Sequence, residues 1–107
     1  MNFNNQGYMT RGFEETIPTE VKILLSTILL NKIASNNELD YLQVIKLTKK
    51  YGNGNIIQHI SWEQEQPASK SEYEFPVREA VTCKVYCIDD ETHHTYLLAE
   101  EYWYESI

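Results

Sequence analysis

Cysteine, proline and glycine are scarce in this chain of 107 residues, which contains two, three and four of them. Cys83 and Cys87 stand four residues apart in a stretch that is predicted to be a strand, which would place their Cα atoms about 13 Å apart. A disulfide spans at most about 7 Å between Cα atoms, so these two thiols cannot pair within one chain. Free thiols predict a cytoplasmic protein, because small exported domains commonly depend on disulfides.

Long apolar runs and targeting segments are also missing. The longest apolar stretch, residues 23–30, is interrupted by Ser26 and Thr27, whereas a membrane span needs about 20 apolar residues. The first ten residues are rich in Asn and have neither the cationic stretch nor the apolar run of a secretory signal. We therefore expect no export and no membrane contact.

Basic residues are few in the second half of the chain. Residues 1–59 hold five acidic and six basic residues, whereas residues 60–107 hold eleven acidic residues against Lys70, Arg78 and Lys84. The second half therefore carries a charge of −8 and the first half a charge of +1, which together give the net charge of −7. Such a charge repels nucleic acid, whose binding needs cationic contacts to phosphate, and attracts a basic protein surface.

One helical pattern stands out in what the sequence does contain. Pro18 suits a first helical turn, Thr16 is the expected cap just before it, and residues 35–37 (Ser-Asn-Asn) end the pattern. Between these signals, apolar residues recur at helical spacing and predict an amphipathic helix from about Pro18 to Ala34. Its core-facing stripe comprises Val21, Leu24, Leu25, Ile28 and Leu29.

After Leu39 the apolar period changes to two, which is typical of strands. Strands are predicted over residues 41–48, 56–62, 72–78, 81–87 and 95–104, with a weaker one over 8–13. Gly52-Asn53-Gly54 predicts a hairpin turn, residues 64–70 a loop, and Pro76 an edge position for its strand.

These patterns predict a single α+β domain over residues 1–107. Its N-terminal amphipathic helix would pack on a mostly antiparallel sheet of about five strands, because strands joined by short turns run antiparallel. Disorder is expected, if anywhere, in residues 1–7.

The predicted helix has apolar residues on its outer side as well. Ile23 and Leu30 stand seven residues apart and are nearly aligned, with Ile33 to one side. These three residues could dock a partner helix or a second copy of the chain, or an N-terminal arm could cover them. Ile23, Leu30 and Ile33 are therefore the candidate docking or dimer residues.

Residues 89–94 hold the densest group of titratable side chains. Asp89, Asp90 and Glu91, with His93 and His94, could ligate a divalent metal. Their spacing matches neither a calcium-binding loop of the EF-hand kind nor a His-Glu-x-x-His helix, and it is typical of a solvated hairpin tip.

Catalytic patterns are weak elsewhere in the chain. His59 lies near Ser61, but no third orienting group or nucleophile turn of the Gly-x-Ser-x-Gly kind accompanies them. We therefore assign no catalytic residue, no metal ligand and no cofactor, and we expect the protein not to be an enzyme.

Acidic and aromatic residues supply the candidate partner-binding surface. Carboxylates two apart on a strand lie about 7 Å apart on one face, a spacing that could imitate a phosphate track. The C-terminal tail adds aromatic side chains, which are enriched in binding hot spots. The predicted partner-binding residues are Glu63, Glu65, Glu72, Glu74, Asp89, Asp90, Glu91, Glu100, Glu101, Trp103 and Tyr104.

Several short segments, taken in order, carry a resemblance to a known family. They are Tyr8-Met9-Thr10-Arg11-Gly12, Ile17-Pro18, Asp40-Tyr41-Leu42-Gln43-Val44, Gln64-Glu65-Gln66-Pro67 with Tyr73, Ile88-Asp89-Asp90, and Leu97-Leu98-Ala99-Glu100-Glu101-Tyr102. In order and spacing they resemble the domain of unknown function 960 family over nearly the whole chain. The resemblance implies an origin in Gram-positive bacteria or in their phages and plasmids, and it supplies no activity or catalytic residue. Residues 51–55 and His93-His94 depart from the family pattern.

Three functions are compatible with these observations, in this order of preference. The first is a non-enzymatic interaction protein whose acidic surface binds a basic protein and inhibits a nucleic-acid-handling complex. The second is a small-molecule or metal-dependent enzyme that uses His59, Asp89, Asp90 and His93. The third is a homodimer with a structural role, joined through the docking residues of the helix.

Overall fold

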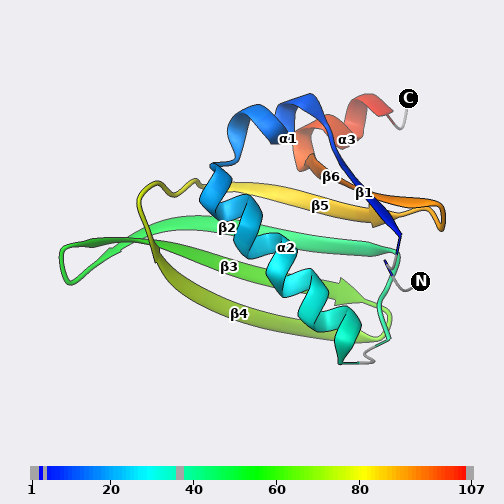
Figure 1. Ribbon diagram of the computed structural model, residues 1–107, viewed down its shortest axis with the longest axis horizontal. Helices are drawn as coiled ribbons and strands as arrows, with labels where there is room; N and C mark the ends of the chain where they lie inside the picture. The colour runs from blue at the N-terminus through cyan, green and yellow to red at the C-terminus, as the bar shows by residue number, and fades with distance from the viewer. Residues whose placement is uncertain (1–2, 4, 36–37, 106–107) are drawn as a thin grey trace.

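The computed structural model describes residues 3, 5–35 and 38–105, and the side chains as far as Tyr102. Six strands and three helices follow one another along these residues (Figure 1). They are β1 Gln6–Met9, α1 Arg11–Thr16, α2 Thr19–Ala34, β2 Leu42–Gly52, β3 Asn55–Glu65, β4 Ala68–Val77, β5 Cys83–Asp89, β6 His93–Leu98 and α3 Ala99–Glu105. Of the segment 1–7, residues 1, 2 and 4 lie outside the described residues, whereas Phe3 is buried and Gln6 begins β1.

All described strands belong to one sheet, in the order β1-β6-β5-β2-β3-β4. Four of the five pairings are antiparallel, and β1 pairs with β6 in parallel. The α+β class is therefore confirmed. The prediction of about five strands that all follow the helix is wrong, because a strand precedes α1 and α2 and joins the sheet beside the last strand of the chain.

The long helix α2 matches the predicted span, but the elements before it differ. The Thr10 hydroxyl accepts a hydrogen bond from the N–H of Phe13 at 3.2 Å, which caps α1. This cap turns residues 11–16 into a helix, so that the predicted strand over 8–13 is wrong beyond Met9. Thr16 ends α1 and does not cap α2, whose first N–H groups follow Pro18.

Two hairpins differ in how well the sequence predicted them. Asn53 and Gly54 form the turn between β2 and β3 with φ angles of 52° and 78°, as the Gly-Asn-Gly signal predicted. The predicted loop over 64–70 is wrong, because β3 continues to Glu65 and β4 begins at Ala68. The predicted last strand over 95–104 is confirmed as far as Leu98, where β6 ends, and is wrong beyond it, because α3 follows.

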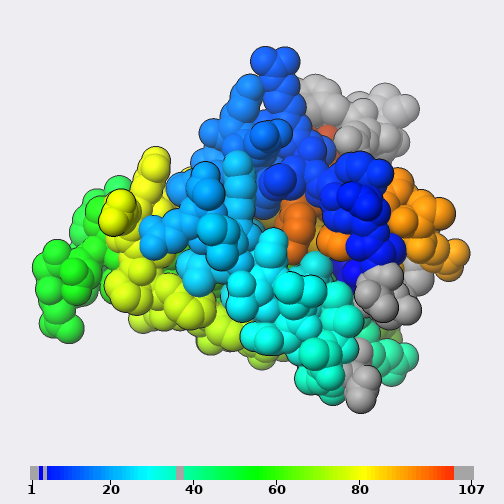
Figure 2. Space-filling model, viewed as in Figure 1, coloured from blue at the N-terminus to red at the C-terminus, as the bar shows by residue number. Residues whose placement is uncertain are grey.

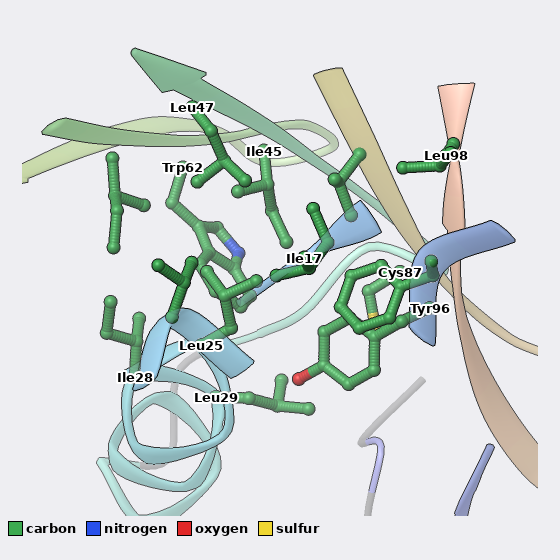
Figure 3. Packing of buried hydrophobic residues seen from close by; sticks show 14 of the residues in the cluster. Ile17, Leu25, Ile28, Leu29, Ile45, Leu47, Trp62, Cys87, Tyr96 and Leu98 are labelled. Atoms are coloured by element: carbon green, nitrogen blue, oxygen red, sulfur yellow. The ribbon is translucent and has the colours of Figure 1, made fainter. Parts of the chain in front are cut away.

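The hydrophobic core lies between α2 and one face of the sheet (Figure 1). Leu25 and Leu29 of α2 pack toward Trp62, Ile45 and Tyr96 of the strands, as Figure 3 shows. The Phe13 ring of α1 stacks on Tyr96 with 5.2 Å between ring centroids. Cys83 and Cys87 are free thiols on this same face, and Cys87 is fully buried.

The other face of the sheet is open except at one end, where α3 lies. Leu97 is buried on this side of β6, and the Tyr102 ring of α3 stands edge-on to Tyr86 at 5.4 Å. Across the described residues, no helix is long and apolar enough to cross a membrane.

Candidate functional site

Four of the predicted partner-binding carboxylates share the open face of the sheet. Glu63 and Glu65 lie on β3, and Glu72 and Glu74 lie on β4 with the same alternation. The spacing correctly placed Glu63 with Glu65, and Glu72 with Glu74, on one face of each strand, and the β3–β4 register brings the two pairs to the same face of the sheet.

Lysines from neighbouring strands interleave with these four carboxylates. The lysines on this face of β2, β4 and β5 are Lys46, Lys50, Lys70 and Lys84. Two ion pairs cross between strands, Lys46 with Glu63 at 3.2 Å and Lys50 with Glu74 at 3.1 Å, and His59 Nε2 lies 3.2 Å from Glu72 Oε1. The open face is thus balanced in charge, and the negative excess of the protein lies elsewhere.

The turn between β5 and β6 holds two aspartates in opposite surroundings. Asp90 is exposed, and its Oδ1 accepts the N–H groups of Thr92 and His93 at 3.1 and 2.8 Å. These bonds, the one from His93 above all, hold the pKa of Asp90 below its ordinary value, and His93 Nε2 lies 3.1 Å from Asp90 Oδ2. Asp89 is only 3% exposed, so it cannot contribute to an acidic surface as predicted.

Asp89 instead anchors the N-terminal segment. Its carboxylate accepts the side-chain amide of Asn5 at 2.7 Å and the N–H of Phe3 at 3.3 Å. The Asn5 oxygen in turn lies 2.7 Å from His94 Nδ1, and the His94 ring contacts the rings of Phe3 and Tyr96. Burial lowers the pKa of His94, and the opposing charge of Asp89 does not reverse that shift.

The C-terminal residues divide in a similar way. Glu100 is exposed at the start of α3, whereas Glu101 turns inward. Glu101 Oε1 accepts the Thr10 hydroxyl at 2.7 Å and the N–H of Leu98 at 2.8 Å. Trp103 and Tyr104 fall within α3, and their side chains lie outside the described residues.

The residues of the hypothetical enzyme do not converge on one site. His59 lies on the open face of β3 beside Glu72, whereas Asp90 and His93 form the turn between β5 and β6. Asp89 points into the core side of that turn. Within residues 3, 5–35 and 38–105, no three His, Cys, Asp or Glu side chains stand close enough together to hold a metal ion.

The outer side of α2 borders a pocket that the sequence did not indicate. Ile23 and Leu30 are 61% and 65% exposed, whereas Ile33 is half-buried against the core. Between α2 and β1 lies a hollow of about 360 Å³ with β6 at its floor, which Figure 2 shows between the light blue helix and the dark blue strand. Its lining residues are Gly7, Tyr8, Met9, Phe13, Thr19, Lys22, Ile23, Ser26, Thr27, His94 and Tyr96.

We call this region the β1–α2 surface and define it by the pocket together with the exposed apolar side chains of Tyr8, Met9, Ile23 and Leu30. Tyr8 and Met9 are 53% and 47% exposed. Their exposure could not be inferred from the sequence, because it follows from the position of β1 at the edge of the sheet.

The segments that carried the family resemblance contact one another through side-chain hydrogen bonds. Asp40 and Gln43 of one segment contact Gln64 of another: Gln64 Oε1 accepts the Asp40 N–H at 3.2 Å and Gln43 Nε2 at 2.9 Å. Thr10 of another segment likewise bonds to Glu101. These residues therefore position elements of the fold.

Comparisons with known proteins agree with this fold. A family model described as a staphylococcal protein of unknown function (DUF960) matches residues 6–101. A solved structure of a protein of unknown function from Enterococcus faecalis is similar, with a TM-score of 0.70 and 19% sequence identity over 94% of this chain and 95% of that one. At this identity the similarity shows the fold alone. A comparison with curated proteins gave no match.

Proposed function

This chain belongs to the DUF960 family, whose function is unknown, and we propose that it is a non-enzymatic protein-interaction module. The observation that carries the proposal is the contrast between the two edges of the sheet. The β4 edge has Lys70, Glu72, Glu74 and Pro76, which are the residues that proteins use to block unwanted strand pairing. The β1 edge, Gln6–Met9, is exposed along its length and has neither a charge nor a proline.

The apolar side chains beside that edge support the same function. Tyr8, Met9 and Ile23 all border the pocket, so exposed apolar residues of β1 and α2 stand around one hollow. Grouped apolar side chains on a surface favour protein–protein contact, whereas scattered ones are ordinary. The β1–α2 surface is therefore the proposed docking region.

The charge of the protein selects the kind of partner. With the open face balanced, the net charge of −7 comes from the helices, the turns and the ends of the sheet. A field of this sign speeds encounter with a basic protein. It fits the predicted partner-binding carboxylates that are exposed outside the open face, Asp90, Glu91 and Glu100. We propose a cytoplasmic basic partner, with inhibition of a nucleic-acid-handling complex as the outcome of binding and a phage or mobile element as the origin.

Comparative capture from a Gram-positive bacterial lysate tests this proposal. The bait would be the wild-type protein, an Ile23→Glu, Leu30→Glu variant, and a Tyr51→Glu control at the β2–β3 hairpin tip, where Tyr51 is 74% exposed. We expect a basic partner that the wild type and the control retain and the double variant loses, with retention that falls as salt rises. Equal retention by all three baits would refute the proposed surface.

A homodimer is the second candidate, because the same exposed Ile23 and Leu30 could face a second copy. The half-buried position of Ile33 leaves that residue less available for an interface than predicted. Light scattering of the wild type and of the Ile23→Glu, Leu30→Glu variant separates the two candidates, since only a dimer would halve its mass in the variant.

A further inference from the structure

We propose that the partner binds as an extended segment that adds a strand to the outer edge of β1. This inference rests on the proposed function and names its mode of recognition. The segment would run antiparallel to β1, place one apolar side chain in the pocket, and carry basic residues after that side chain.

The main chain of β1 is oriented to accept such a strand. The N–H of Thr10 donates to the carbonyl of Tyr96 at 3.0 Å, so Thr10 faces β6. Alternate residues of a parallel strand point their N–H and C=O groups to opposite sides. The N–H and C=O groups of Gly7 and Met9 therefore point away from β6, and no strand in the described part of the chain pairs with that side.

The pocket supplies a site for one side chain beside this edge. Gly7 lines the pocket with its backbone alone. A Cβ atom at this position would lie 2.9 Å from His94 Nε2, so a larger residue would have to displace the His94 ring. Lys22 is the one Lys, Arg, Asp or Glu residue of the described lining, and its ammonium group donates to the Glu14 carbonyl at 2.7 Å. An apolar side chain such as Leu or Phe suits this lining better than an acidic one.

The acidic turn between β5 and β6 determines where the basic residues of the segment would lie. Gln6 lies opposite His93 in the register, and the Asn5 amide donates to the Glu91 carbonyl at 3.3 Å, so this turn stands at the beginning of β1. An antiparallel segment passes Met9 first and reaches the turn about 10 Å later, or roughly three residues on. Basic residues at that point would face the exposed carboxylates of Asp90 and Glu91.

Selection of short random peptides on the full-length protein, with counter-selection on the Ile23→Glu variant, tests the sequence class. We expect enrichment of an apolar residue followed three or four positions later by Lys or Arg. A synthetic peptide of that class, with a dye for fluorescence anisotropy, should bind about tenfold more tightly than the same residues in reverse order. Enrichment of no such class, or equal binding of the reversed peptide, would overturn the inference.

Backbone methylation of the same peptide tests the binding mode on the unaltered protein. Because an added strand uses alternate N–H groups, N-methylation should weaken binding about tenfold or more at every second residue and little between them. Binding that is indifferent to methylation, or that favours helical peptides, would refute strand addition while leaving the proposed interaction function intact. The proposed function itself fails only in the capture experiment with the three baits.

Discussion

Replacing Gly12 by alanine should destabilise the protein through one distant residue, Glu101. Gly12 lies in α1 and has no backbone need to be glycine, since its φ is not positive. A Cβ atom there would lie 2.5 Å from Glu101 Oε2 and 2.7 Å from Glu101 Cδ. Contacts that short do not occur, so the carboxylate of Glu101 would have to move.

The cost of that movement can be worked out from what holds the carboxylate in place. Glu101 accepts hydrogen bonds from the Thr10 hydroxyl at 2.7 Å and the Leu98 N–H at 2.8 Å. A bond to a charged group contributes roughly 1.5–3 kcal/mol, and water would replace part of this at a half-buried site. Alanine offsets up to about 1 kcal/mol, because it favours a helix more than glycine does. We expect Gly12→Ala to lower the free energy of unfolding by about 2 kcal/mol.

A double-mutant cycle in urea provides the assay. In a Glu101→Ala background the obstructing carboxylate is gone, so that adding Gly12→Ala should be neutral or should stabilise the protein by up to about 1 kcal/mol. The substitution therefore changes sign between the two backgrounds. If Gly12→Ala cost the same in both, the close approach of α1 to Glu101 would not be what requires glycine at this position.

Three further predictions concern buried polar and titratable groups. Gln64→Leu removes bonds to Asp40 and Gln43 and should lower the free energy of unfolding by roughly 2–4 kcal/mol, whereas the exposed control Gln66→Leu should change it by less than about 0.5 kcal/mol. Burial lowers the folded pKa of His94 below 6.5, so the folded state binds fewer protons and stability falls as pH drops through 6.5. Urea midpoints from about pH 8 to pH 5 should fall less steeply for His94→Gln. Burial raises the pKa of Cys87, so its thiol should react with an alkylating reagent only after unfolding, and fast labelling of the native protein would contradict its place in the core.

The parts of the fold that the sequence predicted are those with local signals. The helical period after Pro18 and the Gly52-Asn53-Gly54 turn each specify a structure within a few residues, and α2 and the β2–β3 hairpin are where they were expected. The short helices α1 and α3 contain six and seven residues, too few for a period to be recognised. Thr10 caps α1, and Glu101 accepts the N–H of Leu98 just before α3, whereas the bond between Glu101 and the Thr10 hydroxyl exists only in the folded chain.

Buried polar residues explain the error over residues 64–70. A polar, proline-containing stretch is typical of a loop, but Gln64 is buried with its amide fully engaged. Its nitrogen donates to the carbonyls of Glu38 and Pro67 at 3.0 and 2.8 Å. A glutamine that is satisfied in this way can occupy a core-facing strand position, and patterns of hydrophobicity do not detect it.

In the candidate site, too, features within one strand could be predicted from the sequence, whereas contacts between strands could not. Alternation correctly placed Glu63 with Glu65 on one face of β3, and Glu72 with Glu74 on one face of β4. Their pairing with Lys46 and His59 depends on the register between strands, which spacing within one strand does not contain. The β1–α2 surface depends on the order of strands in the sheet, and for that reason it had no signal in the sequence.

The pairing of β1 with β6 also fixes when, during protein synthesis, the proposed binding edge can exist. Among the described strands β1 is made first, yet the only one that holds it in place ends at Leu98. A nascent chain that still lacks β6 therefore has no template on which residues 6–9 can become an ordered edge. The chain emerging from the ribosome would present this edge to a partner only after β6 has been translated, which keeps an exposed strand from pairing with other nascent chains.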